Sequence, residues 1–321
     1  MLFNSIDYLI FLPIVFLVYY VIPKRVRYIW LLFVSYCFYM RWNPWYVFLL
    51  FGCTVTTYIA ARLIERDRGR TQSGTIHCRR TVLVICVLVL LSVLGYFKYY
   101  DFFLGYFNKL LSILHISPVS RRFSVLLPVG ISFYILQALG YVFDVYRGET
   151  YAEKNFLRYA LFVSFFPQLV AGPIERSKNL LTQLAKPIRL SWRNFCKGLI
   201  LIMYGLFCKM VIADRIAIVV NTVYEDSAAY PGMYIAYAAF LFSFQIYCDF
   251  YGYSTIARGS SLLFGIKLTD NFNAPYYSGS VKEFWRRWHI SLSSWFRDYL
   301  YIPLGGNRKG EARKEGNLLF V

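Results

Sequence analysis

Nine apolar runs constrain the fold of this chain more than any other feature. They cover residues 6–22, 28–40, 44–61, 81–97, 124–143, 156–171, 195–213, 230–250 and 256–268. Hydrophobic residues make up 58% of the 321 residues and charged residues 16%, against roughly a quarter charged in soluble domains. A soluble core cannot bury that much apolar surface, whereas a bilayer solvates it. We predict an all-α polytopic membrane protein with eight or nine passages, the shorter runs being re-entrant or packed inside the bundle.

Basic segments between the runs predict the orientation in the membrane. Six arginines lie in residues 62–80, and further cations lie in residues 24–27 and 176–197. Cytoplasmic loops of membrane proteins are enriched in Lys and Arg, so we expect these segments on the cytoplasmic face. The N-terminus and the tip at residues 41–44 then lie outside, and residues 6–22 form a retained first span rather than a signal peptide.

Composition argues against several other classes of function. The net charge of +18 would suggest nucleic acid in a soluble protein, but here the cations lie in loops and should attract anionic lipid headgroups. We expect no nucleic-acid partner. The seven cysteines form no C-x-x-C pair and the chain has three histidines, so we expect no disulfide, no metal and no bound cofactor.

The segment Lys282–Gly306 is the most informative part of the sequence. On one continuous helix from Glu283 to Leu300, the aromatic side chains fall within an arc of about 140°. His289 lies at the edge of that arc, beside Arg286 and Ser293. An interfacial amphipathic helix explains the pattern without catalysis, and a lone histidine there is more often a structural hydrogen-bonding group. The segment also contains Trp285, Trp288, Trp295 and Asp298.

A second group of polar residues lies at the end of a long apolar run. Gln245, Asp249 and Tyr253 are spaced four residues apart and share one face if helix continues through Gly252. An ionisable residue at membrane depth is costly and faces a cavity or a partner. We expect Asp249 to pair with Arg258 or with an arginine of the 282–306 segment, and a purely structural ion pair explains it equally well.

Two further stretches are candidates for a passage or for close packing. Residues 166–176 contain Gln168 and are interrupted by Pro and Gly, including Pro173. Irregular backbone at membrane depth is tolerated only inside protein or beside water, which suggests a passage lining, although an ordinary helix end is an equal alternative. Residues 127–147 are read as a span with small residues for close helix contact.

Together these stretches resemble the membrane-bound O-acyltransferase family, in its alginate O-acetylase-like branch. The stretches are MLFNSIDYLIFLPIVF, LPVGISFYILQALGYVFDVYRG, FPQLVAGPIERS, QIYCDFYGYSTIA and WRRWHISLSSWFRDYLYIPLGGNRKG. The last is the most specific. Near Asp249 the family pattern usually reads D-F-S-G-Y-S-D, whereas this chain has Tyr251 and Thr255 at the positions of the Ser and the second Asp.

The resemblance implies a ring of tilted transmembrane helices around a thin centre, pierced by a tunnel. It makes residues 1–321 a single domain that lacks its C-terminal helices, and residues 316–321 look like the start of another span. His289 matches one of two functional histidines of the family. The other, regarded as catalytic, lies downstream in a W-H-G motif that this sequence does not contain, so we expect this chain alone to be unstable and inactive.

The resemblance also implies acyl transfer, chiefly of acetyl, from acetyl-CoA or another acyl thioester on the cytoplasmic side to hydroxyls of an exported polysaccharide. The missing histidine would be the base, while His289 would orient the acyl group. Trp285, Trp288 and Trp295 would exclude water, and Arg286 or Arg287 would hold an anionic donor. Tunnel residues would be Gln168, Pro173, Gln245, Asp249, Tyr253, Ser293 and Asp298.

Partners and alternatives follow from the same resemblance. A bacterial inner-membrane location, the lipid bilayer, and separately encoded extracytoplasmic acyl-transfer proteins are expected. One alternative is D-alanyl transfer to teichoic acid from a carrier-protein thioester. A transporter or lipid-handling protein is an alternative of another class, which a pair of matching broken helices in two halves would support. No inverted repeat is visible in the sequence.

Overall fold

The computed structural model describes residues 2–68, 73–117, 119, 127–170, 172–186, 189–307, 316 and 317, and its regular structure there is entirely helical. The longer helices are α1 (Ile6–Val21), α2 (Arg27–Met40), α3 (Tyr46–Arg66), α4 (Ser73–Ile113), α5 (Ile131–Tyr146), α6 (Phe156–Ser164), α9 (Trp192–Leu206), α10 (Asp214–Glu225) and α11 (Gly232–Leu263). The predicted all-α class is confirmed.

Short helices complete the path of the chain. They are α7 (Phe166–Leu169), α8 (Ser177–Leu184), α12 (Val281–Arg287) and α13 (Ile290–Phe296), together with 3₁₀ turns η2 (Ser227–Ala229) and η3 (Pro275–Tyr277). Two π-helical segments, η1 (Phe207–Ala213) and η4 (Arg297–Tyr301), directly continue α9 and α13.

Within the described part of the chain, four helical stretches are long and apolar enough to cross a membrane. They are Tyr46–Arg66, His77–Ile113, Trp192–Glu225 and Gly232–Leu263, while α1 and α5 are apolar but shorter. Eight or nine spans were expected, and the described helices differ for three physical reasons. Runs 230–250 and 256–268 form the single helix α11, and run 156–171 is broken at Phe165. Helices α1, α2 and α5, which correspond to runs 6–22, 28–40 and 124–143, have only 14 to 16 residues. Residues 124–126 and 318–321, parts of predicted apolar segments, lie outside the described residues.

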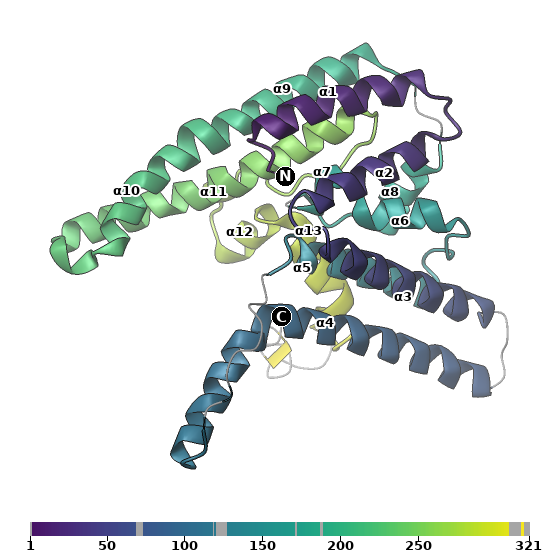
Figure 1. Cartoon of the computed structure of the whole chain (residues 1–321), viewed down its shortest axis with the longest axis horizontal. Helices are drawn as coiled ribbons and strands as arrows, with labels where there is room; N and C mark the ends of the chain where they lie inside the picture. Colours follow the sequence, from purple (N-terminus) through teal and green to yellow (C-terminus); the bar gives the residue numbers. More distant parts are fainter. Residues whose placement is uncertain are drawn as a thin grey trace.

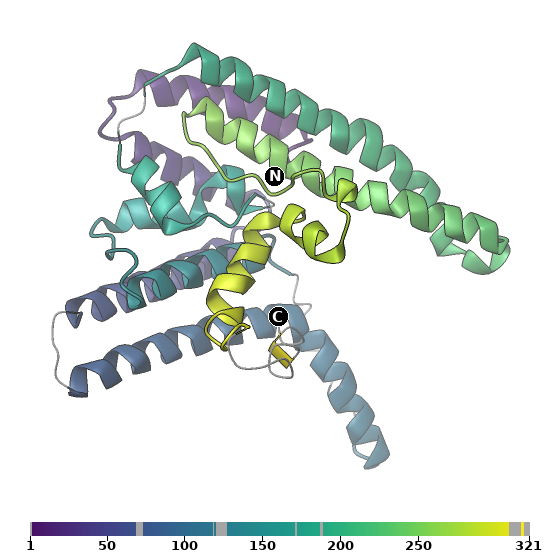
Figure 2. The same ribbon diagram turned by 180° about the vertical axis from the view of Figure 1, so that it is seen from behind.

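The helices form three neighbouring groups. Figure 1 shows α9, α10 and α11 as a long antiparallel hairpin with α1 beside it, and α3 with α4 on the opposite side. The short helices α6, α7 and α8 lie between these groups together with α2. Figure 2 shows α12 and α13 between the long hairpin and α4, so the most specific sequence motif lies at the centre of the molecule.

Glycines allow the two arms of the long hairpin to approach closely. Gly198 and Gly205 on α9 are seven residues apart, as are Gly252 and Gly259 on α11. A Cβ atom on Gly205 would lie 2.7 Å from the carbonyl oxygen of Gly252, and one on Gly259 would lie 2.6 Å from that of Gly198. The antiparallel pairs therefore form a seam in which backbone packs on backbone, as small residues permit in membranes.

Phe166 joins three helices at the centre of the core. Its backbone N–H donates to the Ser35 hydroxyl of α2 at 3.1 Å, and its ring packs edge-on against Phe264, just after α11. The same end of α11 is tied to α1, because the hydroxyls of Tyr8 and Ser260 are hydrogen-bonded at 2.6 Å. The break at Phe165 is therefore stabilised by a buried polar partner and by aromatic packing.

Replacing Gly205 with Ala should lower the stability of the chain. The new methyl group would push α9 away from α11, which we expect to cost roughly 1–3 kcal/mol, as overpacking does. Gly95→Ala in α4 is the matched control, because nothing lies within 4 Å of a Cβ there. Thermal unfolding in detergent should show a lower midpoint for Gly205→Ala alone. Equal midpoints for the two variants would rule out a close-packed seam.

Candidate active site around His289

The predicted continuous helix from Glu283 to Leu300 is wrong, because the chain breaks immediately before and at His289. Helix α12 ends at Arg287, Trp288 is extended, and His289 has a left-handed backbone with φ +43° before α13 begins at Ile290. This conformation is uncommon for residues other than glycine and is worth explaining by its surroundings. The aromatic arc drawn on one helix therefore does not exist.

Asn271 supplies the contacts that hold this break. Its carbonyl oxygen accepts from the Ile290 N–H at 2.9 Å, and its side-chain Oδ1 accepts from the Ser291 N–H at 3.3 Å. Two of the free donors at the start of α13 are thereby satisfied. On the other side, the Ser291 hydroxyl accepts from the Ile174 N–H at 3.0 Å. Sequence reasoning missed Asn271, since an asparagine in a loop has no spacing that marks it.

His289 is buried and neutral. Its side chain packs edge-on against Phe250 of α11, with ring centroids 4.7 Å apart, and stacks with Phe133 of α5, with ring centroids 6.1 Å apart. The residue is 8% exposed, and among the described residues Nδ1 has no hydrogen-bond partner. His289 lies outside the four candidate spans, and burial lowers the pKa of its imidazole to about 4. A buried neutral imidazole with a free nitrogen can bind a hydroxyl or a carbonyl partner, depending on its tautomer.

The tryptophans of the motif lie in three different environments. Trp295 is 4% exposed and donates from Nε1 to the Leu136 carbonyl of α5 at 2.8 Å. Trp288 packs edge-on against Phe272, with ring centroids 5.1 Å apart. Trp285 is 54% exposed. Trp288 and Trp295 thus pack against different parts of the protein, whereas Trp285 lies on the surface.

Two other predicted residues of the motif flank the break. Ser293 donates its backbone N–H to the carbonyl of His289 at 3.0 Å and its hydroxyl to the carbonyl of Trp288 at 3.2 Å. It therefore supports the first turn of α13. Arg286 is exposed and is therefore accessible from the surface of the protein.

The broken segment after α6 packs inside the protein. Gln168 is 3% exposed and donates from Nε2 to the Phe162 carbonyl at 2.9 Å, and Pro173 is also buried. Glu175 is 2% exposed, accepts from Asn179 Nδ2 at 2.5 Å, and its pKa is raised by burial. The irregular backbone is thus covered by protein, and a passage along it stays a prediction.

A polar network fastens the far end of the motif. Asp298 forms an ion pair with Arg176 at 2.7 Å. The Tyr299 hydroxyl donates to the Asp144 carboxylate at 2.5 Å, and the Ser177 hydroxyl donates to its other oxygen at 2.8 Å. These contacts join η4 to α5 and to the start of α8. Close packing was expected around Asp144, but its buried hydrogen bonds were not.

Asp249 has a partner different from the predicted one. Its carboxylate lies 2.6 Å from Lys209 Nζ in η1, and Lys209 also contacts Asp214 at 2.7 Å. Arg258 instead pairs with Asp270. The expectation of Arg258 was wrong because it considered residues close in sequence, whereas η1 packs across the hairpin. A single lysine in an apolar run was the available signal.

The shared face of Gln245, Asp249 and Tyr253 is confirmed, because α11 continues through Gly252. The Tyr253 hydroxyl donates to the Asn4 side chain at 3.3 Å. The residue that reaches the imidazole of His289 is the neighbouring Phe250 rather than Asp249. Three motifs, from α5, the 165–176 segment and α13, thus converge. Asp249 instead pairs with Lys209 of η1.

Comparison with known proteins places this arrangement in a family. Residues 151–321 match the membrane-bound O-acyltransferase family. The chain belongs to that family. It is 40% identical over its whole length to the probable alginate O-acetylase AlgI of Pseudomonas putida, and 36% identical to the peptidoglycan O-acetyltransferase of Helicobacter pylori. It covers 65% of each of these two relatives. A teichoic acid D-alanyltransferase of Bacillus subtilis is 28% identical over 73% of this chain.

The buried histidine should make stability depend on pH. The pKa of His289 is near 6.5 when unfolded and about 4 when folded, so between these values the unfolded state binds more protons. The free energy of unfolding should therefore fall as the pH is lowered from 6.5 to 4, by roughly 3 kcal/mol in total. Denaturant unfolding across this range should show the fall.

Two histidine variants test this pH dependence, one at the site and one as a control. His289→Asn, which tolerates a left-handed backbone, should remove this part of the pH dependence. His115→Asn should retain it, because His115 is exposed and has the same backbone handedness. An unchanged pH profile for His289→Asn would contradict a depressed pKa.

Loss of the Asn271 side chain should loosen the start of α13. Asn271→Ala leaves the buried Ser291 N–H without its acceptor, which we expect to cost roughly 1–3 kcal/mol. The control is Asn273→Ala, since Asn273 is exposed and, among the described residues, forms a hydrogen bond only through its backbone. Amide hydrogen exchange at residues 290–291 should accelerate in Asn271→Ala and stay unchanged in the control. Slow exchange in both variants would show that Asn271 does not hold the break.

Proposed function

We propose that this chain forms part of a bacterial inner-membrane O-acyltransferase that transfers an acyl group, chiefly acetyl, to hydroxyls of an exported polysaccharide. The observation that carries the proposal is His289, a buried neutral imidazole at the junction of the converging motifs, whose Nδ1 has no partner among the described residues. Relatives named for O-acetylation of alginate and peptidoglycan are 36–40% identical, against 28–32% for D-alanyltransferases. This difference favours acetyl over D-alanyl.

The reaction needs a proton acceptor and a dry site. The acceptor hydroxyl oxygen attacks the thioester carbonyl, a carbon–oxygen bond forms, the carbon–sulfur bond breaks, and the hydroxyl proton leaves with a base. The thiolate product takes up a proton. His289 would bind and orient the reacting groups through its free nitrogen, while the family resemblance assigns the base to a second histidine downstream of residue 321.

The surroundings of His289 suit this chemistry. The rings of Phe133 and Phe250 contact His289, and Trp288 packs on Phe272, which in turn packs on Phe250. This aromatic cluster would exclude water and protect the thioester from hydrolysis. Arg286 is exposed and available to an anionic donor such as acetyl-CoA. Extracytoplasmic acyl-transfer proteins would complete delivery to the polymer.

The test uses the whole protein that contains this chain, expressed in membranes. His289→Asn should reduce transfer of radiolabelled acetyl groups to the exported polysaccharide by roughly a hundredfold, the effect expected when a group that orients the reactants is lost. The protein level and its unfolding midpoint at pH 7 should stay unchanged. His115→Asn, an exposed histidine, should retain full transfer.

Two results would contradict the proposal. Full acetyl transfer by His289→Asn would remove His289 from the site. Incorporation of radiolabelled D-alanine rather than acetate, lost in the same variant, would assign the chain to D-alanyl transfer instead.

A further inference from the structure

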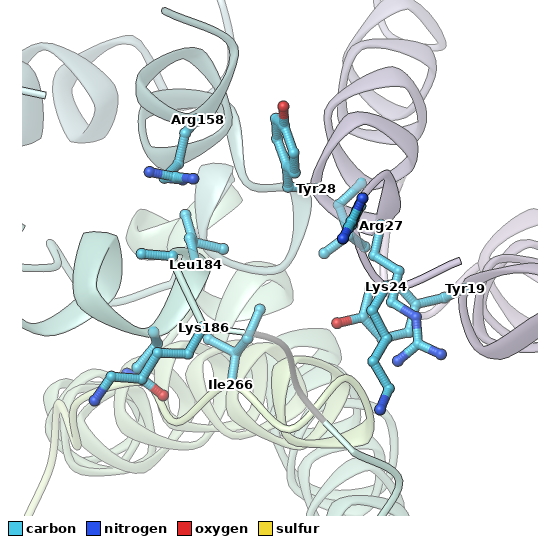
Figure 3. A pocket seen from close by; sticks show the side chains of 12 residues that line it. Tyr19, Lys24, Arg27, Tyr28, Arg158, Leu184, Lys186 and Ile266 are labelled. Atoms are coloured by element: carbon cyan, nitrogen blue, oxygen red, sulfur yellow. The ribbon is translucent and has the colours of Figure 1, made fainter. Parts of the chain in front are cut away.

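A cavity of about 370 Å³ opens between the α1–α2 turn, α6 and the end of α8. Its volume falls within the range of small-ligand sites, roughly 300–1,000 Å³. Figure 3 shows Lys24 and Arg27 on one side and Arg158 and Lys186 on the other, with Tyr28 between them. None of the residues to which the reaction was assigned lines it. The cavity is lined by Tyr19, Lys24, Arg25, Arg27, Tyr28, Leu31, Arg158, Gln183, Leu184, Ala185, Lys186 and Ile266.

The lining has five cations and no carboxylate. Within the described part of the chain, Lys24, Arg25 and Lys186 form no ion pair or hydrogen bond through their side chains. Arg158 pairs with Glu153 at 3.3 Å, yet its buried Nε has no partner among the described residues. Lys24, Arg25 and Lys186 thus lie together without a counter-charge among the described residues, and because like charges repel one another, the arrangement favours a bound anion.

Arg27 has a different role from the other cations. It is 8% exposed, and it donates to the backbone carbonyls of Tyr20 at 3.1 Å and of Ile22 at 3.3 Å. Its guanidinium carbon lies 5.0 Å from the centre of the Tyr19 ring. Arg27 is thus held by the α1–α2 turn and forms a fixed positive wall.

The cavity lies where a membrane surface is expected. Four of its five cations come from two basic segments, residues 24–27 and 176–197, that are separately predicted to be cytoplasmic, while Arg158 comes from α6. The meeting of the two segments here puts both at the same end of the molecule. Helix α1 leads to this end with an apolar outer face, on which Leu17 is 62% and Val21 84% exposed. In a membrane protein that face contacts lipid chains.

The lining itself is amphipathic. Leu31, Leu184 and Ile266 supply the apolar part of the lining, beside the charged residues. A phosphate surrounded by Lys and Arg, with the first carbons of a glycerol or acyl chain against leucines, would match both halves. A soluble anion would use only the charged half.

We propose that this cavity binds the phosphate of an anionic phospholipid from the cytoplasmic leaflet. Phosphate is the shared chemistry, and the lipid is the source favoured by the apolar walls and by the neighbouring lipid-facing α1. The site is separate from His289 and does not depend on acyl transfer.

The test compares lipid binding by the whole protein that contains this chain, in nanodiscs of neutral phosphatidylcholine with or without added phosphatidylglycerol. Native mass spectrometry and the unfolding midpoint report binding. The double variant Lys24→Gln, Lys186→Gln should bind phosphatidylglycerol roughly tenfold more weakly than the wild type, because two phosphate-facing cations are lost. The matched control, Arg66→Gln with Arg189→Gln, removes two exposed cations outside the cavity and should bind as the wild type does.

Other outcomes would overturn the proposal. Equal losses in both double variants would show that general surface charge attracts the lipid. Unchanged lipid binding in the cavity variant, with stabilisation of the wild type alone by inorganic pyrophosphate in neutral nanodiscs, would assign the phosphate to a soluble molecule.

Discussion

The arrangement around His289 depends on the hydrogen bonds that Asn271 makes to the start of α13. A helix start leaves backbone N–H groups without partners, and burying them unpaired would be costly. Asn271 accepts from two of them, and Ser291 in turn binds the Ile174 N–H. These contacts fix a left-handed residue between two short helices. They also bring the broken 165–176 segment and α13 to the same place.

Burial then determines the charge state of the site. His289 contacts aromatic rings and no carboxylate among the described residues, so desolvation favours its neutral form. A charged imidazole would need a counter-ion. The carboxylates of Asp298 and Asp249 instead form ion pairs with other residues. Positive charge is therefore kept away from a group whose use depends on a free nitrogen lone pair.

The sequence predicts helices better than it predicts breaks. Apolar periodicity identified the long helices, and the four-residue spacing of Gln245, Asp249 and Tyr253 placed them on one face correctly. The break at His289 was missed because α-helical periodicity continues through it, while Asn271, which stabilises it, lies well upstream. Lys209 was also missed as the partner of Asp249, because η1 packs across the hairpin rather than lying close in sequence. Both depend on contacts across the fold, which spacing along the chain does not record.

The glycine seam explains how such cross-chain contacts become possible. Because Gly205 and Gly252 let α9 and α11 touch through their backbones, η1 lies directly against the middle of α11, where Lys209 reaches Asp249. The opposite side of α11 remains free to present Phe250 to His289. One helix thus separates a charged pair from a neutral imidazole. A larger residue in the seam would move α11 and disturb both sides together, which links close packing of the hairpin to the geometry of the site.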